Sequence, residues 1–273
     1  VSFYSISGFF TTPVTILIEG TNDLNEAKIA AQRVFEILDM ERENGDREYI
    51  HIPENLEPEI HFKGISYKYP GKRMLFSDLT FSAPKGKITT ITGKNGSGKS
   101  TLAALLMRNY TPENGHINVS NLNINLFHIK EWRKYISIIP QQESLFDGNV
   151  LENIVVGEEM PDISKVMEIC ELVGMIDFID SLPRGMLTQI GEKGKFLSGG
   201  KRIKISVARA LYRNPKVLVM EEVNSHLDEV SAKRIYTLCR KLADKGITVI
   251  NITHDSKFLE YSDYIVNLDK CDH

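Results

Sequence analysis

The stretch Gly93-Lys-Asn-Gly-Ser-Gly-Lys-Ser-Thr101 decides the fold of this chain. It fits the pattern G-x-x-x-x-G-K-[ST], in which glycines, a lysine and a hydroxyl residue have fixed places. The four fixed positions are Gly93, Gly98, Lys99 and Ser100. Residues 87–92 before the stretch are largely β-branched, and residues 102–107 after it are strong helix formers. The sequence therefore predicts a strand, a glycine-rich loop and a helix in succession.

A loop of this kind is suited to binding phosphate. Glycines let the backbone curl so that successive N–H groups point inward, and the start of the helix adds partial positive charge. Lys99 can reach the outer phosphates, and the Ser100 hydroxyl can ligate Mg²⁺. An ordinary glycine-rich turn is the alternative. The complete motif between a strand and a helix favours a nucleotide site.

Composition limits the class of protein. The chain has 273 residues, which corresponds to about one or two domains, and 42% of them are hydrophobic. A net charge of −3 gives no indication of a general nucleic-acid binder. The three cysteines, Cys170, Cys239 and Cys271, lack metal-ligand spacing, and their odd number indicates a reducing compartment.

The N-terminal 18 residues carry no charge and only just reach the length that crosses a membrane. They are interpreted either as the truncated end of a transmembrane helix or as a short apolar segment that packs on the core or is disordered. With Val1 in place of Met and no leader visible, we expect a piece of a longer protein. A helix is expected over residues 22–38, capped by Asn22 or Asp23, and an acidic linker over residues 41–58.

Periodicity predicts the remaining elements. Residues 60–83 contain short β-type runs with a turn at 69–72, and several helical patterns lie between residues 141 and 197. The other expected helices cover 126–134, 164–173 and 201–212, and the other expected strands cover 135–139, 217–220 and 248–252.

Four further segments carry candidate chemistry. Residues 197–201 form a second glycine-rich turn that opens a helix, and so a second potential anion site. A buried strand ends in Glu221 and Glu222, which can hold Mg²⁺ through water or polarise an attacking water. Gln141 and His254 each follow another strand. Each alone could be an ordinary surface residue, but their order along the chain favours one site.

These motifs resemble those of the ATP-binding cassette (ABC) ATPases from residue 60 to the C-terminus. The loop at 93–101 matches Walker A, and Leu197-Ser-Gly-Gly-Lys201 matches the family signature with Lys201 in place of Gln. Residues 217–222 match Walker B followed by the catalytic carboxylate, and Ser225-His-Leu-Asp228 matches the D-loop.

The resemblance implies a role for each matching residue. Residues implied in catalysis are Glu222, His254, Gln141 and Lys99. Residues implied in ATP binding are Tyr69, Gly93, Asn95, Gly96, Ser97, Gly98, Lys99, Ser100 and Thr101, with Tyr69 stacking on adenine. Residues implied to bind the ATP of a partner domain are Ser198, Gly199, Gly200 and Asp228. Ser100, Gln141 and Glu221 are implied to hold Mg²⁺.

Two other segments point to the exporter branch. Thr188-Gln-Ile-Gly-Glu-Lys-Gly194 resembles a sequence that exporters carry just before the signature. The helix at 22–38 resembles the connection between the last membrane helix and the ATPase in bacterial peptide and bacteriocin (lantibiotic) exporters. This favours residues 1–18 as the truncated end of a transmembrane helix.

Several positions depart from the family pattern. Glu221 stands where Asp is usual, which adds a methylene to a carboxylate near a metal that demands strict geometry. Lys201 replaces a neutral amide and could hold phosphate or point to solvent. Asn224 and His226 also differ from the usual residues. Retention of Glu222 and His254 favours a site that hydrolyses ATP.

The resulting prediction is an α/β P-loop NTPase of the ABC type. It has a mixed or parallel core sheet, a small antiparallel β region and a helical subdomain at about 142–197. Residues 19–58 are a connecting helix and linker, and 59–273 the ATPase domain.

ATP and Mg²⁺ are the expected ligands. The expected partners are a second ABC ATPase domain, identical or related, and a transmembrane domain of the same polypeptide, with no nucleic acid. The expected location is the cytoplasmic face of the membrane, and export of a peptide or other small cargo the function. A regulatory module with little hydrolysis and a soluble non-transport ATPase are the alternatives.

Overall fold

The computed structural model describes residues 2–40, 43, 48–141, 145–191, 194–223 and 227–270. The chain divides into two compact units, residues 1–47 and 48–273. We describe each unit by itself. The predicted segment boundaries at residues 18, 58, 142 and 197 stay predictions.

The first unit is built on one helix, α1 (Ser2–Leu38), with Pro13 inside it. A helix is confirmed over residues 22–38, but the predicted cap is wrong, because Asn22 and Asp23 lie in the helix interior. The helix continues toward the N-terminus through the apolar segment. From residue 13 onward nearly all of its side chains are exposed. Within the described residues, no helix combines the length and the apolar character needed to span a membrane.

The second unit contains a four-stranded antiparallel sheet with the order β2-β1-β4-β5. The strands are β1 (Ile60–Lys68), β2 (Met74–Ala83), β4 (Asn114–Val119) and β5 (Leu122–Asn123). The predicted antiparallel region therefore exists. It extends beyond residue 83, because β4 adds to the free edge of β1 with Ile60 opposite Val119.

A five-stranded sheet with the order β6-β7-β8-β3-β9 lies at the centre of this unit. Its strands are β6 (Ile136–Ile139), β7 (Val217–Glu221), β8 (Thr248–Ile252), β3 (Ile88–Thr92) and β9 (Tyr264–Asn267). Every pairing between them is parallel. Helices α2 (Lys99–Leu106), α3 (Ile129–Tyr135), α8 (Glu229–Asp244) and α9 (Ser256–Leu259) connect or follow these strands.

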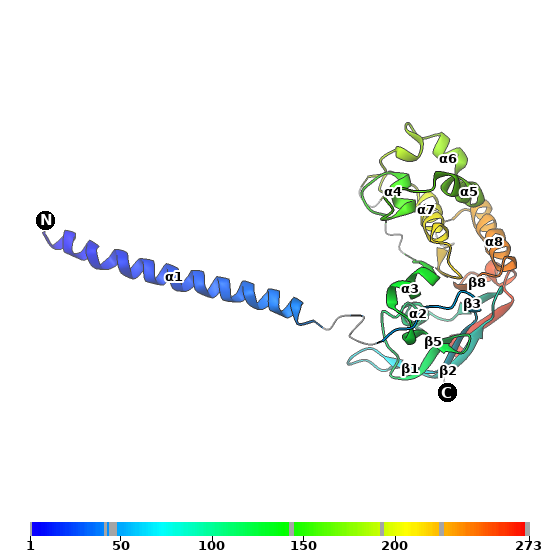
Figure 1. The fold of residues 1–273 in the computed structure, drawn as a ribbon, viewed down its shortest axis with the longest axis horizontal. Coiled ribbons are helices and arrows are strands. Elements are labelled where there is room, and N and C mark those ends of the chain that lie inside the picture. Colours follow the sequence, from blue (N-terminus) through cyan, green and yellow to red (C-terminus); the bar gives the residue numbers. More distant parts are fainter. Residues whose placement is uncertain are drawn as a thin grey trace. The chain divides into compact units, whose positions relative to one another are not determined.

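A group of helices forms the rest of this unit, as Figure 1 shows for α4 to α7. They are α4 (Val150–Val155), α5 (Ile163–Val173), α6 (Ile176–Asp180) and α7 (Gly199–Tyr212), with a 3-10 turn η2 (Gly185–Leu187). Two other 3-10 turns are η1 (Ile124–Leu126) and η5 (Leu268–Lys270). The helical patterns expected between residues 141 and 197 thus become several short helices rather than one long one.

Strand alternation divides the core into two clusters. Val217 and Val219 of β7 pack with the antiparallel sheet and α2, whereas Leu218 and Met220 pack with the helices α4 to α8. The first cluster holds Trp132, which is fully buried and donates from Nε1 to the Leu106 carbonyl at 2.8 Å. The parallel sheet is therefore covered on both faces, which explains why its strands are mostly apolar or β-branched.

Asn153 provides a test of this packing. Its amide is fully buried, donates to the carbonyls of Phe146 and Asn149, and accepts from the Phe146 N–H and from Arg209. Asn153→Ala leaves these groups without partners, so we expect a loss of about 2–4 kcal/mol of unfolding free energy in urea. Asn125→Ala, at an exposed position, should change it by less than about 0.5 kcal/mol. Equal effects of the two variants would contradict this role of Asn153.

Candidate functional site

The glycine-rich loop leaves the end of β3 and runs into α2, so the predicted strand, loop and helix are confirmed. Gly98 immediately precedes α2 with φ 94°, a left-handed conformation. A Cβ there would lie 2.4 Å from Cζ of Phe76, and one at Gly93 would lie 2.6 Å from Oγ of Ser97. Only glycine fits these two positions, because both the backbone angle and the space exclude a side chain.

Lys99 lies inside this loop. Its side chain is 7% exposed, and Nζ donates to the carbonyls of Gly93 at 2.8 Å and Lys94 at 2.9 Å. Among the described residues, the buried Oγ of Ser97 has no hydrogen-bond partner. Asn95, Gly96 and Ser100 are more open. A buried cation, backbone N–H groups and an unpaired hydroxyl together suit a phosphate group.

Aromatic side chains lie beside the loop. The Tyr69 hydroxyl is 3.0 Å from Oγ1 of Thr101, and the Tyr69 ring packs edge-on against Tyr67 and Tyr110. Tyr67 is only 5% exposed, whereas Tyr69 is half-buried and Tyr110 is exposed. The Tyr69 ring is thus available for stacking in a way that the Tyr67 ring is not. Nothing in the sequence indicated that Tyr110 would pack against Tyr69, because Tyr110 lies in no recognised motif.

A second cluster forms at the ends of β6, β7 and β8. Glu222 follows β7, and its carboxylate accepts from Nε2 of Gln141 at 2.9 Å. On its other oxygen, Glu222 is 3.4 Å from Nδ1 of His254. The structure therefore brings these three predicted residues together. Glu222 has φ 48°, which is rare for a residue with a side chain and directs the carboxylate out of the strand.

Glu221, the last residue of β7, lies in a different environment. It is 9% exposed, and burial raises the pKa of its carboxyl from 4.5 to about 7. The charge of Glu222 acts in the same direction, and the backbone N–H of Gln141 acts against both. Two adjacent glutamates thus differ in burial and in the groups they contact.

The donor set fits Mg²⁺ only if other ligands complete the shell. The described residues contain no group of three or more His, Cys, Asp and Glu side chains that could hold a metal ion. Glu221, the Ser100 hydroxyl and the Gln141 amide provide hard oxygen atoms. Mg²⁺ in nucleotide sites usually takes one or two carboxylates and completes its shell with phosphate and water, and this set supplies one carboxylate.

The signature residues lie at the start of α7, among the helices rather than at the glycine-rich loop of the same chain (Figure 1). Ser198 precedes the helix, and Gly199 and Gly200 are its first two residues. Lys201 is exposed, and its Nζ lies 4.5 Å from the ring centroid of Phe178 on α6, a cation–π contact.

Asp228 precedes α8 and caps it. Its carboxylate accepts from the backbone N–H and the hydroxyl of Ser231, both at 2.9 Å, and these hydrogen bonds lower the pKa of Asp228. Asn224, Ser225 and His226 lie outside the described residues. So do Glu192 and Lys193 of the segment thought typical of exporters.

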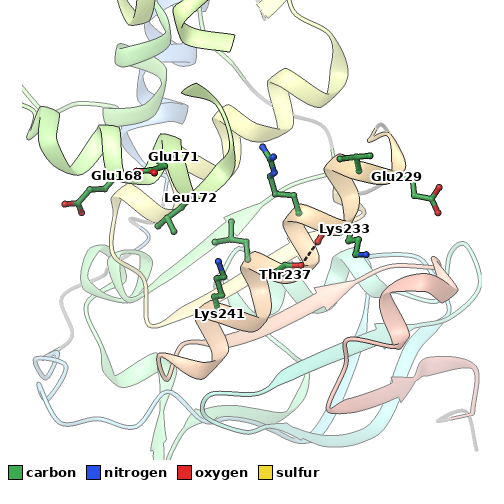
Figure 2. A pocket seen from close by; sticks show the side chains of 10 residues that line it. Glu168, Glu171, Leu172, Glu229, Lys233, Thr237 and Lys241 are labelled. Atoms are coloured by element: carbon green, nitrogen blue, oxygen red, sulfur yellow. Dashed lines mark hydrogen bonds between the residues drawn. The ribbon is translucent and has the colours of Figure 1, made fainter. Parts of the chain in front are cut away.

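An open groove of about 930 Å³ lies elsewhere, between α5 and α8. Figure 2 shows Glu168 and Glu171 on one wall and Lys233 and Lys241 on the other. None of the predicted site residues lines this groove. The chemistry at the strand ends, and not the size of a cavity, therefore identifies the candidate site.

Comparison with known proteins gives a consistent result. A family model described as "ABC transporter" matches residues 76–225. An "ATP-dependent lipid A-core flippase" of Pseudomonas fluorescens is 34% identical over 277 residues, which cover 99% of this chain and 45% of that protein. An "ABC transporter B family member 17" of Arabidopsis thaliana is 33% identical, over 98% of this chain and 22% of that protein.

A solved structure is also similar. The "Structure of a bacterial Atm1-family ABC exporter with ATP bound" superposes with a TM-score of 0.79 at 29% identity, over 90% of this chain and 43% of that chain. The chain spans less than half the length of these curated relatives.

The raised pKa of Glu221 gives a test by pH. Between 4.5, the unfolded value, and about 7, the native state binds more protons than the unfolded state. The contribution of Glu221 to stability should therefore be fully present below pH 4.5 and decline as the pH rises to about 7. In urea unfolding without nucleotide or metal, wild type should lose stability relative to Glu221→Gln across this window. Parallel pH profiles for the two proteins would contradict the assignment.

Proposed function

Because this chain belongs to the ABC transporter family, we propose that it is the domain that binds and hydrolyses ATP in an exporter. The single observation that carries the proposal is the Glu222 carboxylate, held between Gln141 and His254 at the end of β7. A candidate base that follows β7, at the same edge of the sheet as the phosphate loop after β3, supports this proposal. The names of the flippase relative and of the exporter structure support transport as the purpose of hydrolysis.

Lys99 has the central role in nucleotide binding. Its ammonium group is bonded to two carbonyls of its own loop, and exchanges at least one of them for an outer phosphate oxygen of ATP. Since the side chain is already buried, little conformational entropy is lost in binding. The N–H groups of the loop and the start of α2 hold the remaining phosphate oxygens. Tyr69 stacks on adenine.

Glu222 orients the attacking water and accepts its proton. The amide of Gln141 fixes one carboxylate oxygen, which leaves the other near the exposed imidazole of His254. His254 contacts the terminal phosphate from there. Ser100, Gln141 and Glu221 would hold Mg²⁺, which would supply positive charge to offset that of the phosphates.

A second ATPase domain completes the site. Ser198 is exposed, and Gly199 and Gly200 are half-buried at the start of a 14-residue helix, where N–H groups can meet an anion. In the proposed head-to-tail pair, these residues and Asp228 meet the nucleotide held by the partner's loop. Closure excludes water, and hydrolysis reopens the pair. The partner is a second copy of this chain or a related one.

The proposed setting is the cytoplasmic face of a membrane, with a transmembrane domain of the same polypeptide preceding the ATPase. The resemblance of the helix at 22–38 to peptide exporters, and the uncharged segment before it, support this setting. The same resemblance supports a peptide or other small cargo. The relatives' names offer a lipid-linked alternative for the cargo.

A regulatory domain with little hydrolysis is the second candidate. Glu221 favours it, because a buried carboxyl with a pKa of about 7 is partly protonated near neutral pH and binds a cation less well. Measuring ATP binding and Mg²⁺-dependent hydrolysis side by side separates the two candidates.

Glu222→Gln tests the proposed function directly. The amide cannot accept the proton of water, so we expect turnover to fall by roughly a hundredfold or more while ATP still binds. Light scattering should show an ATP-dependent shift from monomer to dimer, because the closed pair stalls. Glu260→Gln, at an exposed position that directly follows α9, is the matched control and should retain wild-type turnover. Unimpaired hydrolysis by Glu222→Gln would remove Glu222 from the mechanism.

Tyr69→Ala tests adenine stacking. Loss of a stacked aromatic costs about 1–3 kcal/mol, so ATP affinity measured by calorimetry should fall roughly 5- to 150-fold. Tyr67→Ala should instead lower the melting temperature, because Tyr67 is a buried core residue. A larger loss of ATP affinity for Tyr67→Ala, measured on folded protein, would show that Tyr69 is not the stacking residue.

A further inference from the structure

The segment after β9 contacts the start of the phosphate loop, although 175 residues separate the two in sequence. Both carboxylate oxygens of Asp269 lie within hydrogen-bond distance of the Lys94 N–H, at 3.0 and 3.2 Å. We propose that Asp269 is a positioning residue, which holds the first peptide of the loop in the conformation that binds phosphate. This inference rests on the proposed function only in taking ATP as the ligand.

The structure holds Asp269 in place for this contact. Strand β9 pairs with β3 up to Asn267 opposite Thr92, the last residue before the loop. The Asn267 side chain then accepts from the Asp269 N–H at 2.9 Å, which turns the chain toward the loop. Leu268 between them is 4% exposed, and its Cβ lies 3.3 Å from where a Cβ of Gly93 would stand. The close approach of these two backbones orients the carboxylate of Asp269.

The two peptide units that flank the Cα of Lys94 are thus each held by a side chain. The Lys94 N–H donates to Asp269, and the Lys94 carbonyl accepts from the Lys99 ammonium. In the proposed binding of phosphate, Lys99 exchanges at least one of its two carbonyl partners, Gly93 and Lys94, so the loop loses an internal support when the ligand arrives. The bond to Asp269 does not involve Lys99. This hydrogen bond therefore maintains the backbone conformation of the loop while Lys99 exchanges a carbonyl for a phosphate oxygen.

If only the negative charge of Asp269 mattered, its removal would change ATP affinity in the direction opposite to that expected for a positioning role. An acidic side chain beside a polyphosphate site repels the ligand, so its removal should strengthen ATP binding. A positioning role predicts weaker binding instead. Asn keeps an acceptor oxygen but not the charge, whereas Ala removes both. Comparing Ala with Asn at position 269 therefore separates the two explanations by the sign of the change.

Asp263 provides a matched control on the same pair of strands. It precedes β9 and accepts from the Ile88 N–H at 2.8 Å, at the end of β3 remote from the loop. It also forms an ion pair with Arg240 at 2.9 Å. Asp263→Ala removes the same kind of contact from the same strand pair, so it should destabilise the fold without touching the loop.

The experiment measures ATP affinity by calorimetry, the melting temperature, and hydrogen exchange at the Lys94 amide without nucleotide, all on the 273-residue chain. For Asp269→Ala we expect a roughly three- to tenfold weaker affinity for ATP and faster exchange at Lys94. Asp269→Asn should bind ATP as tightly as wild type or more tightly. Asp263→Ala should melt earlier, with affinity within about twofold of wild type.

Two results would overturn the proposal: unchanged or tighter ATP binding by Asp269→Ala, or an equal loss in Asp263→Ala, which would indicate general destabilisation. If wild type binds no ATP, the proposed function fails, and exchange at Lys94 still decides whether Asp269 holds the loop. Unchanged exchange in Asp269→Ala would then reject it.

Discussion

The parallel pairing of β3, β8 and β7 is the constraint on which the candidate site depends. Ile91 of β3 pairs with Ile252 of β8, and Ile252 pairs with Glu221 of β7. Because parallel strands end at the same edge of a sheet, the phosphate loop, Glu222 and His254 all begin there. The hydrogen bond from the Glu222 N–H to the Ile252 carbonyl extends the pairing of β7 with β8 by one residue beyond the end of β7. Slippage of this register would separate all the motifs at once.

Burial divides the chemistry between two adjacent carboxylates. Alternation along a strand sends consecutive side chains to opposite faces, and the left-handed backbone of Glu222 adds a further turn. Glu221 is buried, so ionisation of its carboxyl is unfavourable unless a cation lies beside it. Glu222 has polar partners on both oxygens. The same residue type thus has two different environments at adjacent positions, which agrees with the separate roles proposed for Glu221 and Glu222.

Much of the fold follows from local pattern. The strands β3, β7 and β8 are short and almost wholly apolar or β-branched. Gly98 immediately precedes α2 and Gly174 immediately follows α5, both with a positive φ. The sequence did not reveal β4, because it begins with the polar run Asn114-Gly-His, or β9, an edge strand with Tyr264 and Ile265 exposed. Nor did it indicate α8, whose many charged residues obscure the apolar face.

Long-range contacts account for the rest. The positions of Gln141, Glu222 and His254 after three predicted strands favoured one site, and the family resemblance gave each residue a role, but no spacing in the sequence implied their hydrogen bonds. The contact of Lys201 with Phe178 and that of Asp269 with Lys94 were not predicted, because each joins segments without a shared pattern. The structure also corrects the cap at Asn22, where a good capping residue lies within a continuing helix. Tertiary context overrides propensity at such positions.

The buried indole of Trp132 gives this protein a built-in optical reporter. The sequence contains one tryptophan, so emission excited at the red edge comes from one place. That place is stacked between Phe127 and Tyr135 and bonded to the carbonyl that ends α2, the helix whose first residue is Lys99. The emission should be blue-shifted and shielded from iodide while the second unit is folded. Fluorescence then follows the nucleotide-binding region alone, without any label and without interference from α1.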